Sequence, residues 1–418
     1  MELRPGYKQT EIGVLPEDWE ITFLDQIAEV SSGKRLPAGY YVTPHKTPHP
    51  YIRVSDMFAG GVSTENIQYV PVEAANQIKS YRIYKDDIFI SVAGTLGIVG
   101  CIPEELDGAN LTENADRISN IKCDKLFLLY VLRSEIIQKV IESIRTVGAQ
   151  PKLALERIRK FTIPLPPTRV EQKAIATALS DVDTLLASLD ALIAKKRDMK
   201  KAAMQELLTG KTRLPGFNGE WKMFELGKEG ELQKENINPQ QNPKVFFDEY
   251  SMPAFDEGRL PQRVFGETMH SNRTRINGPV LLFNKLNVRQ KRVWLVSKTN
   301  ENSVCSMEFL PYQTSKLDLE LLRHILLTDE ATGFFESCST GTSNSQKRIT
   351  PSAFLEYEVN LPSDLSEQQA IADVLSDMDA ELEALEARYA KVKDMKTGMM
   401  QELLTGKTRL VSTGEQHG

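Results

Sequence analysis

A stripe of apolar residues recurs in two distant stretches of the chain and dominates its hydrophobic pattern. Residues 171–214 and 367–410 align at a constant offset without a gap, and 28 of the 44 aligned positions are identical. Within each stretch the apolar positions alternate in steps of four and three, the seam spacing of a coiled coil. The seam residues are Ile175, Leu179, Val182, Leu186, Leu189 and Ile193 in the first stretch and Ile371, Leu375, Met378, Leu382, Leu385 and Tyr389 in the second. The pattern predicts one long helix per stretch, as an internal repeat.

Each predicted helix has a start and a stop signal. A capping-box spacing marks the start, and a glycine follows the last turn, where a left-handed residue usually ends a helix. The residues are Thr168, Glu171 and Gly210 in the first copy, and Asp364, Glu367 and Gly406 in the second. A helix over 171–209 would be roughly 58 Å long. Because a small domain cannot bury the stripe of so long a helix, we expect the two helices to pack against each other.

The segment before each helix has the pattern of a globular block. In the first block we expect a strand at 87–92, a helix at 126–144, and a strand at 161–165; in the second, a strand at 278–283, a helix at 317–327 and a strand at 359–361. Polar loops fall at equivalent places, at 93–97 and 146–152 in the first block and at 284–292 and 339–348 in the second. We therefore predict an α+β fold with a pseudo-twofold internal repeat, in which two α/β domains are joined by two long antiparallel helices that form a coiled coil. The expected boundaries are 1–167, 168–214, 215–361 and 362–418.

Composition narrows the class of protein. Hydrophobic residues make up 41% of the 418 residues and charged residues 26%, which is typical of a soluble globular protein. No apolar run approaches the 18 residues of a membrane span, and the N-terminus lacks the apolar core of a secretory signal. The four cysteines form no CxxC pair, so we expect buried thiols and no disulfide. The sequence predicts a cytoplasmic protein.

Charge is unevenly distributed along the chain. The net charge is −6, which argues against a simple basic nucleic-acid binder. Residues 257–300, however, carry nine Lys or Arg against two acids, and the last 56 residues carry six basic and eleven acidic side chains. A basic face on a block beside an acidic helix indicates that the block binds phosphate, although a solvated charged surface would give the same count.

The polar loops hold side chains suited to reading DNA. Arg and Lys can bond guanine O6 and N7, while Asn and Gln can bond adenine. The candidate DNA-binding residues are Lys34, Arg35, Arg53, Thr95, Gln150 and Lys152 in the first block, and Arg273, Arg275, Asn284, Asn287, Arg289, Lys291, Asn344, Gln346, Lys347 and Arg348 in the second. Phosphate contacts would set position and base contacts would set specificity.

Other chemical motifs are incomplete. Gly210-Lys211-Thr212 resembles the end of a phosphate-binding loop, but the required earlier glycine is replaced by Gln205. His45 and His49 are separated by prolines that forbid the helix needed to align them on a metal. We expect no catalytic residue, no metal and no cofactor in this chain.

The order of these segments resembles the DNA-specificity (S) subunit of type I restriction–modification systems. The resemblance covers nearly the whole chain and depends on two segments, Pro-Leu-Pro-Pro to Glu-Gln-Lys-Ala-Ile-Ala at 164–176 and Met-Gln-Glu-Leu-Leu-Thr-Gly-Lys-Thr-Arg-Leu at 204–214. Lys196 stands against Val392 in the repeat, which departs from a uniform seam.

The resemblance implies a non-catalytic partner in a larger complex. The blocks would be target-recognition domains, each reading one half of a split site in double-stranded DNA. The helices would set the spacer and dock two methyltransferase subunits, and motor–nuclease subunits would join them. S-adenosylmethionine, ATP and Mg²⁺ would bind in those partners, which would hold the adenine-N6 methyltransferase and ATP-dependent endonuclease activities. The alternative is a coiled-coil adaptor whose blocks bind proteins; unlike a DNA reader, it would show no sequence preference and no steep salt dependence of DNA binding.

Overall fold

The computed structural model describes residues 4–145, 152–341 and 346–411. It divides into two compact units, residues 1–190 with 387–418 and residues 191–386. The boundary falls within both long helices. Each unit therefore contains one globular block, the first half of the helix that follows that block, and the last half of the other helix.

Two four-stranded sheets form the globular block of the first unit. One has the order β11 (Val99–Cys101), β10 (Ile88–Ser91), β13 (Ala115–Ser119), β4 (Glu29–Ser32) and is antiparallel throughout. The other has the order β8 (Gln68–Tyr69), β5 (Pro50–Ile52), β12 (Ala109–Leu111), β9 (Arg82–Ile83). The strand expected at 87–92 is confirmed as β10.

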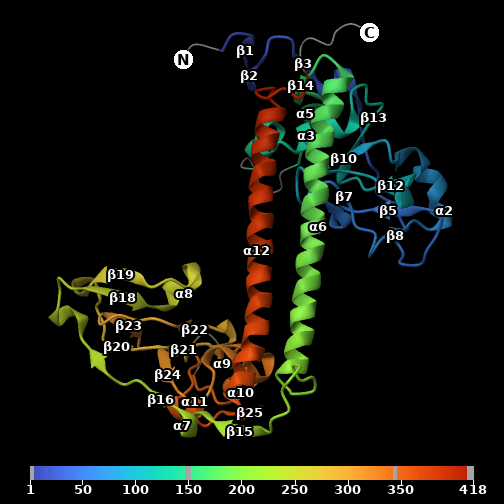
Figure 1. Cartoon of the computed structure of the whole chain (residues 1–418). Coiled ribbons are helices and arrows are strands. Elements are labelled where there is room, and N and C mark those ends of the chain that lie inside the picture. Colours follow the sequence, from blue (N-terminus) through green and yellow to red (C-terminus); the bar gives the residue numbers. More distant parts are fainter. Residues whose placement is uncertain (1–3, 146–151, 342–345, 412–418) are drawn as a thin grey trace. The chain divides into compact units, whose positions relative to one another are not determined.

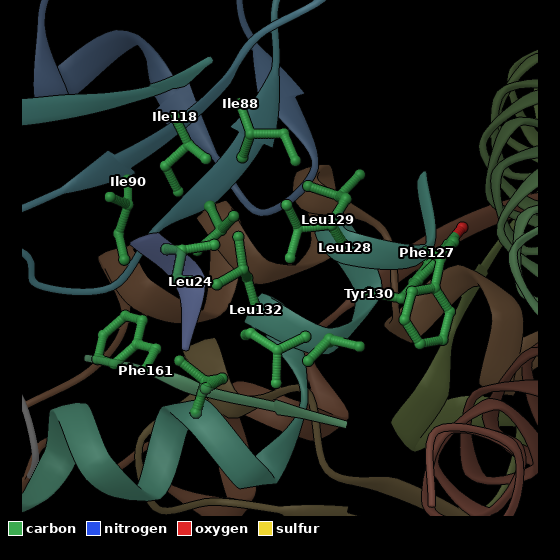
Figure 2. Close-up of a cluster of buried hydrophobic side chains, with 14 of the residues drawn as sticks. Leu24, Ile88, Ile90, Ile118, Phe127, Leu128, Leu129, Tyr130, Leu132 and Phe161 are labelled. Carbon is green, nitrogen blue, oxygen red and sulfur yellow. The ribbon is translucent and has the colours of Figure 1, made fainter. Parts of the chain in front are cut away.

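The main core of the first unit lies between the β10–β13 sheet and two helices, α3 (Lys125–Arg133) and α4 (Glu135–Arg145). Figure 2 shows Ile88, Ile90 and Ile118 from the strands facing Leu128 and Leu132 of α3. The single helix expected at 126–144 is wrong, because Ser134 has an extended backbone (φ −74°, ψ 164°) that ends α3. The apolar periodicity continues through this break, so the sequence pattern did not reveal it.

The second unit repeats this plan. Its four-stranded sheet has the order β16 (Glu231–Leu232), β24 (Phe309–Gln313), β21 (Val280–Asn284), β22 (Val293–Val296). Strand β21 therefore holds the place of β10, and β24 that of β13. A second sheet has the order β17 (Asn236–Ile237), β20 (Arg273–Arg275), β23 (Ser303–Ser306), β18 (Phe246–Tyr250), β19 (Gln262–Phe265). Helices α9 (Leu319–Leu326) and α10 (Asp329–Ser337) cover the first sheet's core.

A two-stranded ribbon joins the start of each block to its end. In the first unit β3 (Glu20–Phe23) pairs antiparallel with β14 (Thr162–Leu165), directly before the first long helix. In the second unit β15 (Trp221–Glu225) pairs in the same way with β25 (Glu358–Pro362). The ribbon places the first turn of each long helix against its own block.

The two predicted long helices are confirmed as α6 (Arg169–Leu207) and α12 (Leu365–Leu403), each 39 residues long. In the first unit the start of α6 lies beside the end of α12, and in the second unit the start of α12 lies beside the end of α6 (Figure 1). The helices are therefore antiparallel in each unit. Gly210 and Gly406 end them with φ of 68° and 67°, as expected for left-handed C-terminal residues.

The seam expectation was incomplete at the helix ends. Ile175 and Leu179 of α6 are buried in the core of the first block, together with Leu403 of α12. Ile371 and Leu375 of α12 are buried likewise in the second block. The first turns of each helix thus complete the hydrophobic core of a globular block as well as facing the other helix. Over the described residues, no helix is long and apolar enough to span a membrane.

Candidate nucleic-acid interface

The predicted residues of the first block gather at one edge of the β10–β13 sheet. Strands β4 and β10 both run antiparallel to β13, which lies between them, so their carboxyl ends meet at the same edge. Lys34 and Arg35 follow β4, and Thr95 follows β10. The sheet topology therefore brings these three residues to the same edge of the sheet.

The segment 112–114, just before β13, connects these loops. Lys34 N donates to the carbonyl of Leu111, directly before this segment (2.8 Å), and Val92 N donates to the carbonyl of Asn114 within it (2.8 Å). Thr112 N donates to Ile52 O (3.1 Å), which places the following Arg53 here, and Leu153 N donates to Val92 O (3.0 Å), which places Lys152 here. Lys34, Arg35, Arg53 and Lys152 thus lie beside this segment or beside Val92, which is bonded to it. Thr95 follows Val92 in the same loop, and Gln150 lies outside the described residues.

Carboxylates orient the two arginines of this edge. Arg35 Nε lies 2.6 Å from Glu113 Oε1, and Arg53 makes a two-pronged contact with Asp56, with Nη2 to Oδ1 at 2.6 Å and Nε to Oδ2 at 3.0 Å. Burial raises the pKa of Glu113, but the hydrogen bond and charge of Arg35 outweigh it, so the pKa is lowered and Glu113 is ionised at neutral pH. Each guanidinium group therefore has a carboxylate partner within its own block.

Tyrosines and a lysine complete the edge. A hollow of about 430 Å³ lies beside Arg35 and is lined by Arg35, Leu36, Pro37, Ala38, Gly39, Tyr40, Tyr41, Val42, Tyr51, Thr112 and Glu113. Tyr41 is 82% exposed. Lys34 Nζ lies 5.5 Å from the centre of the Tyr81 ring. Exposed aromatic rings among cations suit contact with a nucleic acid, because bases stack and phosphates attract cations.

In the second unit the two predicted loops also lie together. Asn287 N donates to Lys347 O (2.8 Å), and Ile349 N donates to Lys285 O (3.1 Å). Leu286 and Arg348 form an isolated β-bridge. The loop after β21 and the described residues 346–348 thus form one surface at the edge equivalent to that of the first unit, and Asn344 lies outside the described residues.

Acidic side chains hold the cations of this second surface. Arg289 pairs with Glu336, Lys291 Nζ lies 2.6 Å from Asp329 Oδ1, and Arg348 Nε lies 3.1 Å from Glu308 Oε2. Gln346 is exposed and Lys347 is half-buried. Their side chains face no such carboxylate in the described contacts. The cations here are preorganised in the same way as Arg35.

Three candidates are placed differently from the rest. The side chain of Asn284 is buried (3% exposed), and its Oδ1 accepts from Leu286 N at 3.1 Å, so it shapes the loop. Arg273 and Arg275 lie on β20 in the other sheet. Arg273 Nε binds Glu249 Oε1 at 2.6 Å, and Arg275 Nε lies 3.0 Å from Glu235 Oε1. The structure does not bring these two arginines into the loop surface.

The carboxylates that pair with these cations were not among the residues predicted from the sequence. Glu113 and Glu308 both immediately precede or adjoin the strand that pairs with the loop-bearing strand, β13 in one unit and β24 in the other. A glutamate at this position in both blocks is the sequence feature from which these ion pairs could have been predicted.

The helix ends carry a second set of repeated contacts. In the first unit Arg409 Nη2 binds Glu171 Oε2 at 2.9 Å and Asp18 Oδ2 at 3.0 Å. In the second, Arg213 Nη2 binds Glu367 Oε2 at 2.6 Å. The expected helix starts are confirmed, because Thr168 Oγ1 accepts from Glu171 N at 3.2 Å and Asp364 Oδ1 accepts from Ser366 N at 2.9 Å. The side chains of Glu171 and Glu367, 1% and 0% exposed, pair with these arginines and not with the backbone at the start of their own helix.

A pair of glutamines clamps each helix to its block. Gln172 Oε1 accepts from Asp124 N (2.9 Å), and its Nε2 donates to Pro166 O (2.9 Å). Gln368 does the same with Asp318 N (2.9 Å) and Pro362 O (2.8 Å). Both glutamines are buried and identical in the two copies, so the junction between helix and block is built identically in both units.

Two aspartates at equivalent positions of the repeat bridge the long helices. Asp183 pairs with Lys396 and accepts from Tyr130 Oη at 2.8 Å. Its repeat counterpart, Asp379, pairs with Lys200 and lies 3.8 Å from His324 Nδ1. Each aspartate faces a lysine that the antiparallel arrangement of the helices brings opposite it.

Comparison with known proteins agrees with this repeated architecture. The family model for the type I restriction modification DNA specificity domain matches residues 16–195 and 218–394. The chain belongs to this family. Each match covers one block and most of the helix after it, which is the unit of the internal repeat.

Curated relatives and solved structures are similar to the chain. The MjaVIII specificity subunit of Methanocaldococcus jannaschii is 27% identical over 219 residues, 51% of this chain and 51% of that protein. The putative type I restriction enzyme MjaX specificity subunit of the same organism is 29% identical over 242 residues, which cover 54% of this chain and 55% of that protein. The chain thus aligns with about half the length of these relatives. The type I S subunit from M. genitalium has the same fold, with a TM-score of 0.59 at 13% identity over 96% of this chain and 98% of that one.

Both specificity domains also have a groove at the same place in the repeat. In the first unit it measures about 640 Å³ and includes Thr397, Met400, Gln401 and Thr405. In the second it measures about 790 Å³ and includes the repeat counterparts Lys201, Met204, Gln205 and Thr209. Three of these four pairs are identical, whereas the loops at the sheet edges differ between the units.

Proposed function

We propose that this chain is the DNA-recognition subunit of a type I restriction–modification complex, in which each unit reads one half of a bipartite, asymmetric site. The observation that carries the proposal is a contrast within one chain. The buried glutamine and glutamate contacts at the helix junctions are the same in the two units, while the loops at the equivalent sheet edges carry different side chains. A shared scaffold with two different reading edges fits two unlike half-sites.

The chemistry of the edges supports direct reading of bases. Arg35, Arg289 and Arg348 have forked guanidinium groups suited to guanine, and Gln346 has an amide suited to adenine. The carboxylate partners restrict the rotamers of these arginines, so less side-chain entropy is lost on binding. Lysines such as Lys34 and Lys152 fit phosphate contacts, which position the protein without reading sequence.

The helices fit the role of a spacer between the two readers. Each has 39 residues, a length of roughly 58 Å at 1.5 Å per residue. One turn of DNA measures about 34–36 Å. We therefore infer that the helices hold the half-sites apart by a gap of unspecified bases.

The two matching grooves fit two copies of one partner. Because Met204 and Met400, with Gln205 and Gln401, are the same in both grooves, a single kind of subunit can bind both. We infer that these partners are methyltransferase subunits, with motor–nuclease subunits joining the assembly. Partner subunits would also supply part of the phosphate clamp, which accounts for a net charge of −6 in a DNA-binding chain.

Chemistry would then reside in the partners. S-adenosylmethionine, ATP and Mg²⁺ would bind there, and methyl transfer would require the target adenine to leave the base stack. Among the described residues, no group of three or more His, Cys, Asp or Glu could hold a metal ion. This chain would contribute recognition alone.

A binding selection tests the proposal. The chain, copurified with its methyltransferase subunits, is incubated with a random-sequence duplex pool, and the bound DNA is sequenced. We expect two unlike conserved half-sites at a fixed separation and a steep loss of affinity with salt. An adaptor whose blocks bind proteins would enrich no sequence.

A further inference from the structure

A cavity of about 340 Å³ lies between the two sheets of the first unit, next to the reading edge. It is lined by Ser31, Ser32, Gly33, Ser80, Tyr81, Arg82, Leu111 and Arg117. Three of these residues directly precede Lys34, and Lys34 Nζ lies over the Tyr81 ring at 5.5 Å. The cavity therefore borders the residues that we propose to contact DNA.

Two arginines from different sheets meet in this cavity. Arg117 comes from β13 and Arg82 from β9, and Arg117 Nη1 donates to Arg82 O at 2.5 Å. Arg82 Nη2 lies 3.4 Å from His49 Nδ1. The Nε of each arginine is buried and has no hydrogen-bond partner among the described residues. The protein therefore leaves part of the hydrogen-bonding capacity of both arginines unfilled.

The local charge favours an anion. Asp87 Oδ2 comes no closer than 4.0 Å to Arg117 Nε, and it already accepts from Tyr84 N at 2.9 Å. Asp116 is the neighbour of Arg117 on β13, and alternation along the strand directs it to the opposite face of the sheet. The positive charges of Arg82, Arg117 and Lys34 beside the cavity thus exceed the single negative charge of Asp87.

A close backbone contact fixes the cavity to the reading edge. Gly33 N donates to Ala115 O at 3.0 Å. A Cβ added at Gly33 would lie 2.1 Å from Thr112 O, so only glycine allows this approach. The cavity and the segment 112–114 therefore cannot move independently, and a group held in the cavity would have a fixed position relative to Arg35.

We propose that this cavity binds one backbone phosphate of the DNA, held by Arg82 and Arg117, and thereby sets the register of the first unit on its half-site. This inference rests on the proposed function and adds a specific anchor to it. Guanidinium–phosphate hydrogen bonds are charge-assisted and geometrically specific. A phosphate fixed beside Arg35 would align the base edges with the reading side chains.

Ethylation interference on the selected duplex tests the proposal. We expect that ethylation of one phosphate in the first half-site blocks DNA binding by the unchanged chain. The same ethylation should not reduce DNA binding by Arg82→Gln any further. The slope of log affinity against log salt should become shallower by about 0.9 in the variant, the value for one lost phosphate contact. Half-site preference of the second unit should not change.

A second variant covers the case in which Arg82→Gln does not fold. Ser80 is exposed at the cavity, so Ser80→Asp places a negative charge there without disturbing the core and should remove the same ethylation signal. The matched control is Ser188→Asp on the exposed surface of α6, which should leave the footprint unchanged. An unchanged footprint in Ser80→Asp would overturn the proposal.

A third measurement separates DNA phosphate from free phosphate. Inorganic phosphate is added at matched ionic strength, and thermal unfolding of the chain is recorded. If phosphate stabilises the unchanged chain but not Ser80→Asp, and the DNA footprints of the two are the same, the cavity binds a free anion and the DNA anchor is wrong. Failure to select any preferred duplex would instead refute the proposed function itself.

Discussion

Single residues in this chain act mainly through ion pairs at two kinds of place. At the sheet edges, carboxylates such as Glu113 and Glu308 hold exposed arginines in position for a ligand. At the helix ends, buried carboxylates such as Glu171 and Glu367 fasten the end of the other helix. On the proposed function, the first kind serves recognition, and its residues differ between the units. The second kind fastens the helix ends, and its arginine–glutamate pair is present in both units.

Removing Arg409 should destabilise the first unit. Arg409→Ala leaves Glu171, 1% exposed, as a buried carboxylate without its cation, and we expect the free energy of unfolding to fall by about 3 kcal/mol, the lower end for breaking a buried pair. Urea unfolding followed by Trp19 fluorescence, in a Trp221→Phe, Trp294→Phe background, measures this unit alone. The control Arg409→Ala with Glu171→Gln should recover most of the loss. An Arg409→Ala variant as stable as the parent would contradict this account.

Acid should weaken the second unit through His324. Burial lowers the pKa of His324 from 6.5 to about 4, with Arg323 adding to the effect and Glu320 and Asp379 opposing it. The neutral form is therefore favoured on folding. The contribution of His324 to the free energy of unfolding is fully present above about pH 6.5, the pKa of this histidine in the unfolded chain. It is lost as pH falls from about 6.5 towards 4, at no more than about 1.4 kcal/mol per pH unit.

The pH effect is measured by urea unfolding at pH 7 and pH 5. We expect the unchanged chain to lose about 2 kcal/mol between them and His324→Gln to lose much less. The pKa values of Glu320 and Asp379 are lowered, so these groups titrate below this window. The control His49→Gln should retain the full pH dependence, and an equally steep dependence in His324→Gln would exclude His324 as its source.

Replacing Arg289 should change recognition in the second half-site. Arg289 is 56% exposed and is oriented by Glu336, so Arg289→Ala should relax preference at one base position by about 1–3 kcal/mol. The binding selection measures this directly, and Arg35→Ala is the matched change for the first half-site. Uniform weakening on all sequences would show instead that Arg289 contacts phosphate.

At the scale of elements, the long helices were the most predictable part of the fold and their ends the least. The four–three spacing predicted both helices. Ile175 and Leu179, however, fit a coiled-coil seam and the core of a globular block equally well, so the spacing could not tell which of the two buries them. Loops could be located because they follow compact apolar strands. The ion pairs of these loops could not be predicted, because the two partners are far apart in the sequence. Arg289 and its partner Glu336 are one example. Pairing across the sheet and between antiparallel helices decides such contacts.

Changing helix length should change the gap between half-sites. Seven residues inserted in both helices, after Asp190 and after Glu386, lengthen each by roughly 10 Å and preserve the seam, which repeats every seven residues. We expect the unspecified gap in the selected site to grow by about three base pairs at 3.4 Å each, with both half-sites unchanged. The same insertion in α6 alone should abolish selection of a spaced site. A gap of unaltered length in the double insertion would refute the spacer role.

At the scale of the whole molecule, the chain is one structural unit used twice. Each unit combines a block, its own helix and the end of the other helix, so each unit can keep its junction while its loops diverge. On the proposed function, this arrangement separates the docking and spacing surfaces, which must stay constant, from the reading edges, which must vary. It predicts that the two half-sites are independent of each other.

Exchange of one block tests this independence most directly. Residues 1–167 are replaced by the corresponding block of another family member, the chain is expressed with its partner subunits, and adenine methylation is mapped across the genome. The account predicts a methylated site in which one half-site is new while the other half-site and the gap are unchanged. A change in both half-sites, or in neither, would contradict it.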